Sequence, residues 1–360
     1  MYNGNLFAHP LSFKCTKFVT RHKPLTHKQW LDRLSSVSDI DLTIDCFNTG
    51  PTIEKLEVVV AEMLGKERAL FVHKGMVGQN AALKQWSVLQ GESVIAVHPQ
   101  SHIICDESDA YQALFNLEAH VFGQPNAAIT ASDIAQLPEK LAAIVLELPV
   151  RRAGFQLPSL ELLDQVRSFA SNQKIPLHID GARLLEAAAY YQLSTAELAQ
   201  YGDSVYISLY KSLGAMAGGI IAGESEFIDD LVTWRSRQGG DLFTAFPYVL
   251  SAFWGIEHYL PRINEFNERA SGLAQKLKNE FGDASIPLPV QCNGFLVELP
   301  ISAERLEERV LNLAQNEGIW ICDRIFPQAT TSRIEIQVGD ALDDWTDNAL
   351  IEVLKQLCNS

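Results

Sequence analysis

Residues 176–191 read PLHIDGARLLEAAAYY, and this stretch changes from a strand pattern to a helix pattern within a few positions. The apolar run ends at Asp180, two small residues follow, and Arg183 opens a helical sequence. Asp180 is therefore predicted at the carboxyl end of a buried strand, which is the edge of an open α/β sheet where ligands bind. Gly181 and Ala182 leave room beside the carboxylate for a flat ligand.

A second apolar run brings a lysine to the same edge. Residues 204–209 are predicted as the next strand, Lys211 follows it, and the glycine-containing segment GAMAGG (214–219) comes next. Because parallel strands end at one edge of a sheet, we expect Lys211 and Asp180 in one pocket. This pair suits pyridoxal phosphate: the lysine forms a Schiff base with the aldehyde, and the carboxylate keeps the pyridine nitrogen protonated.

Each of the two residues also has a structural interpretation. Asp180 would cap the following helix and pair with Arg183, and Lys211 would be a solvated lysine at a strand end. Both roles are common for these residue types, so neither residue alone decides the question. The two together favour the cofactor site.

Short apolar runs alternate with longer helical stretches along most of the chain, as in βα units that build a mainly parallel sheet. The predicted strands are 69–72, 93–97, 120–122, 141–148, 176–179, 204–209 and 219–222. From about Tyr248 the pattern becomes two helices followed by strand, helix, strand and helix, which indicates a smaller α+β domain. We predict an N-terminal arm (1–45), a large ligand-binding α/β domain (46–247) and a small C-terminal domain (248–360).

Composition and charge limit the possible functions. The 360 residues are 47% hydrophobic and 20% charged, which is ordinary for a globular protein, and the net charge of −15 argues against a nucleic-acid-binding surface. The six cysteines lie far apart without a CxxC pair, so neither a metal site nor a disulfide framework is predicted. No uninterrupted apolar run reaches about 18 residues, and the N-terminus lacks a signal-peptide core. We expect a cytoplasmic protein without a membrane partner.

Two motifs, LHIDGARLLEAA (177–188) and DSVYISLYKSLGAMAGGIIAG (203–223), resemble the aspartate and lysine motifs of the threonine aldolase and aromatic amino acid β-eliminating lyase family. The resemblance extends over roughly residues 45–340 and includes SHIICDE (101–107). It implies pyridoxal 5'-phosphate as cofactor and the fold type I, aspartate-aminotransferase-like architecture. This has a large, mainly parallel-sheet domain and a smaller α+β domain. It also implies a homodimer or homotetramer with shared active sites.

The resemblance assigns roles to individual residues. Lys211, Asp180 and His102 match catalytic positions, and His102 stands where a family histidine stacks on the cofactor ring and serves in proton transfer. The other cofactor-binding positions are Gly75, Met76, Ala182 and Arg183. Arg333 and Arg183 match the residues that bind the substrate carboxylate. A hydrogen-bonded histidine at a strand-to-loop junction and a surface salt bridge are the structural alternatives for His102 and Arg333. Glu147 either lines the pocket or is a buried glutamate with a structural partner.

The cofactor phosphate site departs from the family pattern. Residues 74–76 read Lys-Gly-Met where the family has Ser-Gly-Thr at a helix N-terminus. Phe243 stands where an arginine often reaches the neighbouring subunit's phosphate. A phosphate dianion at a helix N-terminus still favours a nearby cation. We therefore expect Lys74 to supply it, with Arg235 or Arg237 as the alternative source.

The substrate side of the pocket departs as well. Asp106 stands where aldolases often have an aromatic residue, Tyr210 replaces a serine, and the usual N-terminal Ser-Asp-Thr is absent. The implied reaction is aldol cleavage of a β-hydroxy-α-amino acid to glycine and an aldehyde. Because of these departures, β-elimination to pyruvate and ammonia is a second possible reaction. The third possible function is cofactor binding without turnover.

Overall fold

The structure is a computed structural model that describes residues 4–359, and its internal contacts divide the chain into two compact units. One unit spans Leu25–Ile263, and the other joins the described residues up to Pro24 with those from Asn264 onward. These limits differ from the predicted 1–45, 46–247 and 248–360. The difference arises because helix α11 (Phe246–His258) contributes Val249 and Ala252 to the core of the first unit.

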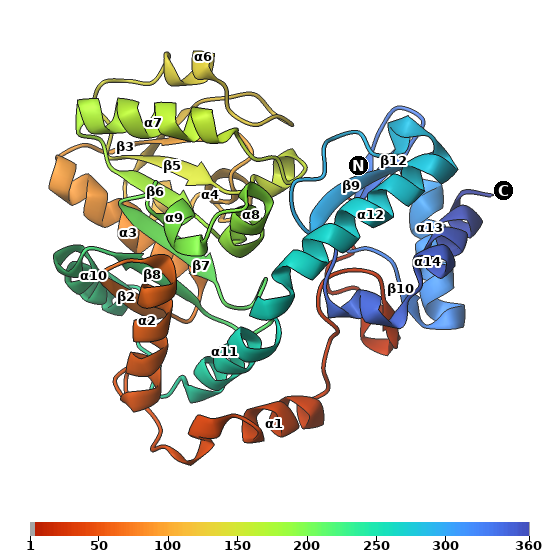
Figure 1. Cartoon of the computed structure of the whole chain (residues 1–360), viewed down its shortest axis with the longest axis horizontal. Helices are drawn as coiled ribbons and strands as arrows, with labels where there is room; N and C mark the ends of the chain where they lie inside the picture. The colour runs from red at the N-terminus through yellow and green to blue at the C-terminus, as the bar shows by residue number, and fades with distance from the viewer. Residues whose placement is uncertain (1–3, 360) are drawn as a thin grey trace. The chain divides into compact units, whose positions relative to one another are not determined.

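The first unit contains a seven-stranded sheet in the order β2-β8-β7-β6-β5-β3-β4. The strands are β2 (Arg68–Val72), β3 (Val94–Val97), β4 (Glu118–Val121), β5 (Ala143–Glu147), β6 (Leu177–Asp180), β7 (Ser204–Ser208) and β8 (Gly219–Gly223). Neighbours from β4 to β7 pair in parallel, whereas β8 is antiparallel to both β7 and β2. All seven predicted strands are thus present, and the sheet is mainly parallel, as expected. Figure 1 shows β3, β5, β6, β7 and β8 as neighbours in this sheet.

Helices cover both faces of this sheet. The helices of this unit are α1 (His27–Ser35), α2 (Pro51–Leu64), α3 (Gly75–Gln90), α4 (His102–Cys105), α5 (Ala110–Ala113), α6 (Ala131–Ile134), α7 (Leu160–Gln173), α8 (Leu184–Tyr191), α9 (Thr195–Ala199), α10 (Ser225–Arg237) and α11. Strand β7 shows the two-sided pattern: Val205 and Ile207 join the core with α2, α7 and α8, whereas Tyr206 packs with α3 and α10. Successive side chains of a strand point to opposite faces, so Ser204 and Ser208 share the α3 side with Tyr206.

The second unit holds an antiparallel sheet in the order β11-β12-β9 and a parallel pair of β1 and β10. Its strands are β1 (Lys17–Phe18), β9 (Gly294–Leu299), β10 (Ile319–Trp320), β11 (Ile325–Pro327) and β12 (Ser332–Gln337). Its helices are α12 (Ile263–Phe281), α13 (Ala303–Glu317) and α14 (Asp347–Cys358). The pairing of β1 with β10 explains why the first residues belong to this unit. Within residues 4–359, no helix has the length and apolarity needed to cross a membrane.

Candidate active site

Three neighbouring parallel strands end at one edge of the sheet and carry the central residues. The register aligns Glu147 of β5 with Asp180 of β6, and Asp180 with Tyr206 of β7. Asp180 is buried, and its Oδ1 accepts a hydrogen bond from the Ala182 N–H at 3.2 Å. Gly181 is required here because a Cβ atom would lie 2.7 Å from the Tyr206 carbonyl oxygen. The carboxylate is therefore fixed at the strand end, as the sequence predicts.

Lys211 lies in the turn that follows β7 and lines the same pocket as Asp180. Burial lowers the pKa of the Lys211 ammonium, and the nearby Arg183 guanidinium lowers it further. A lowered pKa increases the fraction of neutral amine, which is the form that attacks a carbonyl. The two residues that carried the sequence prediction thus meet in one pocket.

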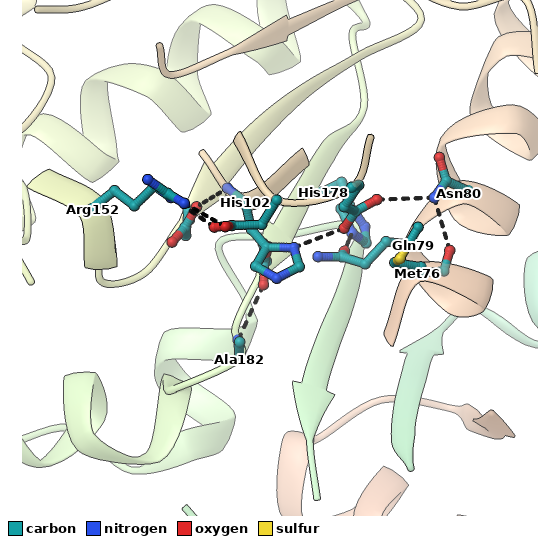
Figure 2. Close-up of polar contacts among 11 residues, drawn as sticks. Met76, Gln79, Asn80, His102, Arg152, His178 and Ala182 are labelled. Carbon is teal, nitrogen blue, oxygen red and sulfur yellow. Dashed lines mark hydrogen bonds and ion pairs between the residues drawn. The ribbon is translucent and has the colours of Figure 1, made fainter. Parts of the chain in front are cut away.

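His102 begins the short helix α4 and is held by two glutamates. Its backbone N–H donates to Glu147 Oε2 at 2.8 Å, and its Nδ1 lies 2.9 Å from Glu107 Oε1 (Figure 2). Because an ionised carboxylate only accepts, Nδ1 carries a proton, which leaves Nε2 as the reactive nitrogen. Burial alone would lower the pKa of His102, but the Glu107 hydrogen bond and the Asp180 charge outweigh it and raise the pKa.

Glu107 and Glu147 hold His102 in position. Glu107 is almost fully buried, and its second oxygen accepts from Asn80 Nδ2 at 3.0 Å. Glu147 also accepts from the Arg151 N–H at 3.1 Å, and burial together with the Asp180 charge raises its pKa. Of the two interpretations of Glu147, the contacts favour the structural one, because its carboxylate binds backbone groups that position α4 and the following loop.

A buried histidine orients a further pocket residue. His178, two positions before Asp180, has its Nε2 2.5 Å from Gln79 Oε1 and its Nδ1 2.8 Å from Ser204 Oγ. Burial lowers the pKa of His178 to about 4, so the ring is neutral near pH 7. Figure 2 shows Gln79 reaching from α3 to His178. With Oε1 engaged, the Gln79 amide nitrogen is available to the pocket.

The pocket at this edge is lined by Lys74, Gly75, Met76, Gln79, His102, Glu107, Asp180, Tyr206, Tyr210 and Lys211. Of the predicted cofactor residues, only Ala182 and Arg183 are not in this lining. Ala182 contributes its N–H to Asp180, and the Arg183 guanidinium lies 5.3 Å from the Phe155 ring centre. The sequence prediction missed Gln79, Glu107 and Tyr206 as pocket residues. A signal existed for Glu107, which is a charged residue within the quoted SHIICDE motif.

The N-terminus of α3 forms one end of the pocket. The first N–H groups of a helix lack partners within the helix and suit an anion. Lys74 is exposed beside them, and its ammonium has no hydrogen-bond or ion-pair partner among residues 4–359. In contrast, Arg235 is buried, with its Nε on Asp241 at 2.9 Å and an Nη on the Phe71 carbonyl at 3.0 Å. Its guanidinium is therefore engaged away from this pocket.

A buried hydroxyl near the N-terminus of α3 indicates whether a cofactor phosphate would fit this end of the pocket. Among residues 4–359, the buried Ser208 hydroxyl has no hydrogen-bond partner of ideal geometry, although the Tyr206 and Tyr210 hydroxyls lie near it. Ser208 lies on the face of β7 that is turned toward α3. A buried hydroxyl without a partner is costly unless a ligand or water completes it. The free helix N–H groups, this hydroxyl and the Lys74 cation form a donor set that suits a phosphate. The residues therefore fit pyridoxal phosphate.

Asp106 follows α4 and forms a bidentate ion pair. Arg152 donates from Nε to Asp106 Oδ2 at 2.7 Å and from a terminal nitrogen to Oδ1 at 2.5 Å (Figure 2). Such fork geometry fixes both side chains. A charged pair thus stands at the position where the family resemblance leads one to expect an aromatic residue.

Arg333 lies on β12 in the second unit, directly opposite Glu298 of β9. Its Nε donates to Glu298 Oε2 at 2.8 Å, and Thr331 Oγ1 donates to Glu298 Oε1 at 2.6 Å. The Thr331 hydrogen bond and Arg333 lower the pKa of Glu298. Among residues 4–359, the terminal guanidinium nitrogens of Arg333 have no hydrogen-bond partner.

The sequence profile of the β-eliminating lyase family matches residues 44–299. The chain belongs to this family. Low-specificity L-threonine aldolase 1 of Arabidopsis thaliana is 26% identical over 313 residues, which are 82% of this lyase and 83% of the relative. A solved Listeria monocytogenes protein assigned as an L-allo-threonine aldolase is 31% identical, with a TM-score of 0.88 and 97% of both chains covered. The predicted family, and with it the prediction of a lyase, is confirmed.

More distant structures confirm the fold alone. A Sphingomonas wittichii serine palmitoyltransferase superimposes on this lyase with a TM-score of 0.67 at 15% identity, covering 94% of this chain and 86% of that one. Together with the mainly parallel sheet, this likeness confirms the predicted fold type I architecture.

Proposed function

We propose that this lyase depends on pyridoxal phosphate and cleaves the Cα–Cβ bond of a β-hydroxy-α-amino acid, giving glycine and an aldehyde. The observation that carries the proposal is the meeting of Lys211, Asp180 and His102 in one pocket at the sheet edge. The names of the relatives support the aldol reaction.

Each part of the cofactor has a residue that suits it. Lys211 would hold the aldehyde carbon, Asp180 the ring nitrogen, and the N-terminus of α3 the phosphate. When bound, the cofactor supplies an electron sink for the pair released from the broken bond. Asp180 keeps the ring nitrogen protonated, which is why a buried carboxylate rather than a neutral side chain stands there.

His102 is proposed as the base for the substrate hydroxyl. As the Cα–Cβ bond breaks, the hydroxyl proton passes to His102 Nε2, and Glu107 stabilises the resulting imidazolium through Nδ1. Asn80 in turn fixes Glu107. The positions of Nδ1 and Glu107 thus determine which imidazole nitrogen takes the proton.

A product screen tests the reaction class. Purified protein loaded with pyridoxal phosphate is incubated with threonine, allo-threonine, phenylserine, serine, cysteine and tryptophan, and glycine, aldehyde, pyruvate and ammonia are measured. Glycine with an equimolar aldehyde supports the proposal. Pyruvate with ammonia identifies β-elimination, the second candidate, which the charged Asp106–Arg152 pair keeps open. Cofactor binding without any product would identify a non-catalytic binding protein.

Arg333 is proposed to bind the substrate carboxylate through its terminal nitrogens, while Glu298 holds Nε. Arg333→Leu should therefore raise KM for the amino acid roughly ten- to a hundredfold, because a charge-assisted contact of about 1.5–3 kcal/mol is lost. We also expect a lower kcat and unchanged cofactor affinity. Steady-state kinetics check this, with the exposed Arg305 of α13 changed to Leu as control. An unchanged kcat/KM would move the carboxylate site elsewhere.

Lys74 is proposed to pair with the cofactor phosphate. Lys74→Ser should weaken cofactor affinity about ten- to a hundredfold, the range for a lost charge-assisted contact. The measurement is a cofactor titration of the apoenzyme. Arg237→Ala is the matched control, because Arg237 is exposed and lies over the Trp234 ring, 4.5 Å from its centre. Equal affinities of Lys74→Ser and wild type would contradict the proposal, and a loss confined to Arg237→Ala would support the arginine alternative.

We further propose that the enzyme is a homodimer or homotetramer. Supporting this, four exposed apolar residues follow closely in sequence, namely Ile40, Leu42, Ile44 and Phe47, and Phe47 contacts the exposed Phe243. Phe47 and Phe243 stack edge to face with ring centres 5.5 Å apart, although Phe243 is 68% exposed. Exposed apolar groups of this kind mark association surfaces. Cytoplasmic location is also proposed, supported by six cysteines that are all free thiols.

A further inference from the structure

Tyr206 is a large polar side chain that the family-based roles leave unexplained. It lies in the middle of β7, points toward α3, is only 3% exposed and lines the cofactor pocket. A tyrosine in a core strand usually places its hydroxyl where that group meets a polar partner. The surroundings of the hydroxyl therefore indicate its role.

Two glycines leave the space that the Tyr206 side chain occupies. A Cβ atom at Gly219 of β8 would lie 2.5 Å from Tyr206 Cε2, and a Cβ atom at Gly75 would overlap the Tyr206 hydroxyl oxygen. Gly75 is the first residue of α3, and within residues 4–359 the N–H groups of Gly75 and Met76 have no hydrogen-bond partner, whereas the Val77 N–H donates to the Lys74 carbonyl. The hydroxyl is thus directly against the helix end that suits the phosphate.

Most neighbours of the Tyr206 hydroxyl can donate hydrogen bonds, and the Ser208 hydroxyl can also accept one. Ser208 lies within hydrogen-bond reach of Tyr206 and Tyr210, although among residues 4–359 its buried hydroxyl has no partner of ideal geometry. Lys74 adds a cation at the pocket wall. Hydroxyl, ammonium and N–H groups gathered at one point call for an anion that accepts from them.

We propose that the Tyr206 hydroxyl donates a hydrogen bond to the cofactor phosphate and so replaces the side-chain hydroxyl that Met76 does not provide. This inference rests on the proposed use of pyridoxal phosphate. Burial raises the pKa of Tyr206 well above its ordinary value, and Tyr210 and Asp180 raise it further. The phenol therefore stays protonated, as a donor to an anion requires.

The test compares two ligands that differ only in the phosphate. Dissociation constants of pyridoxal 5'-phosphate and of pyridoxal are measured for apoenzyme from wild type and from Tyr206→Phe, which keeps the ring. We expect the affinity for the phosphorylated ligand to fall about ten- to a hundredfold, the range for one hydrogen bond to a charged group. The affinity for pyridoxal should stay within about twofold of wild type.

Two further variants sharpen the result. Tyr191→Phe removes a tyrosine hydroxyl that donates to the Pro158 carbonyl, and it should change neither affinity. Met76→Thr in the Tyr206→Phe background restores a hydroxyl at the same turn and should recover much of the lost preference for phosphate. This double variant also provides a second reading if the single variant folds poorly.

The outcomes separate this inference from the proposed function. Equal losses for both ligands, or no loss for either, in Tyr206→Phe would overturn the phosphate contact while leaving the cofactor assignment intact. A wild-type apoenzyme that binds neither ligand would instead remove the proposed function.

Discussion

The Lys211→Ala variant should lose turnover by roughly 10⁴-fold, a loss as large as that of a positioned proton-transferring side chain, because the covalent link to the cofactor is removed. The reason is that Lys211 lines the pocket with a pKa lowered by burial and by Arg183, so its neutral amine is available to the cofactor aldehyde. In wild type, borohydride treatment should attach the cofactor covalently to Lys211, as peptide mass spectrometry would show. The rate at which apoenzyme reacts with the cofactor aldehyde should rise with pH. It should reach its plateau at a lower pH than the pKa of an ordinary lysine, because the pKa of Lys211 is lowered.

The matched control is Lys140→Ala, which removes an exposed lysine of the same unit. Its turnover and its labelled peptide should equal those of wild type. Label on a lysine other than Lys211, or no label at all, would disprove the central assignment.

Asp180→Asn should reduce kcat about 10²- to 10³-fold, the usual loss when one preorganised electrostatic contact to the transition state is removed. The replacement is nearly isosteric and still accepts the Ala182 N–H, but a neutral amide cannot hold the ring nitrogen protonated. Cofactor binding should therefore persist. Kinetics and the absorption spectrum of the bound cofactor measure the two effects separately.

Glu147→Gln is the informative comparison, because Glu147 is aligned with Asp180 on the next strand but binds backbone N–H groups. We expect this variant to lower the melting temperature more than kcat. A near-normal kcat in Asp180→Asn, or a larger kinetic effect in Glu147→Gln, would refute the role given to Asp180.

The sequence was sufficient to predict the strands and the residues at their ends. Asp180 and Lys211 follow apolar runs, and parallel pairing then brings such ends to one edge whatever the details of packing. His102 was found through the family motif. Its Nε2 became the reactive nitrogen only when the structure showed the Glu107 carboxylate at Nδ1.

Other features depend on contacts between distant segments and could not be predicted. The apposition of Tyr206 to Gly75 needs the packing of α3 on β7 to be known. The orientation of Gln79 depends on His178, which the sequence presents only as one polar residue in a strand. Helix α11 was assigned by its position after residue 247, whereas its core contacts are with the first unit.

The close approaches around Tyr206 also decide how this lyase can be changed by laboratory evolution. Any larger residue at Gly75 or Gly219 collides with the tyrosine, so libraries that vary these positions singly will yield mostly misfolded clones. A smaller residue at 206 removes the contact with the ring at both positions, whereas the Ile207 carbonyl oxygen, 2.9 Å from a Cβ atom at Gly219, still restricts position 219. Mutations at sites in contact are not additive. Positions 75, 206 and 219 should therefore be randomised together in one combined library.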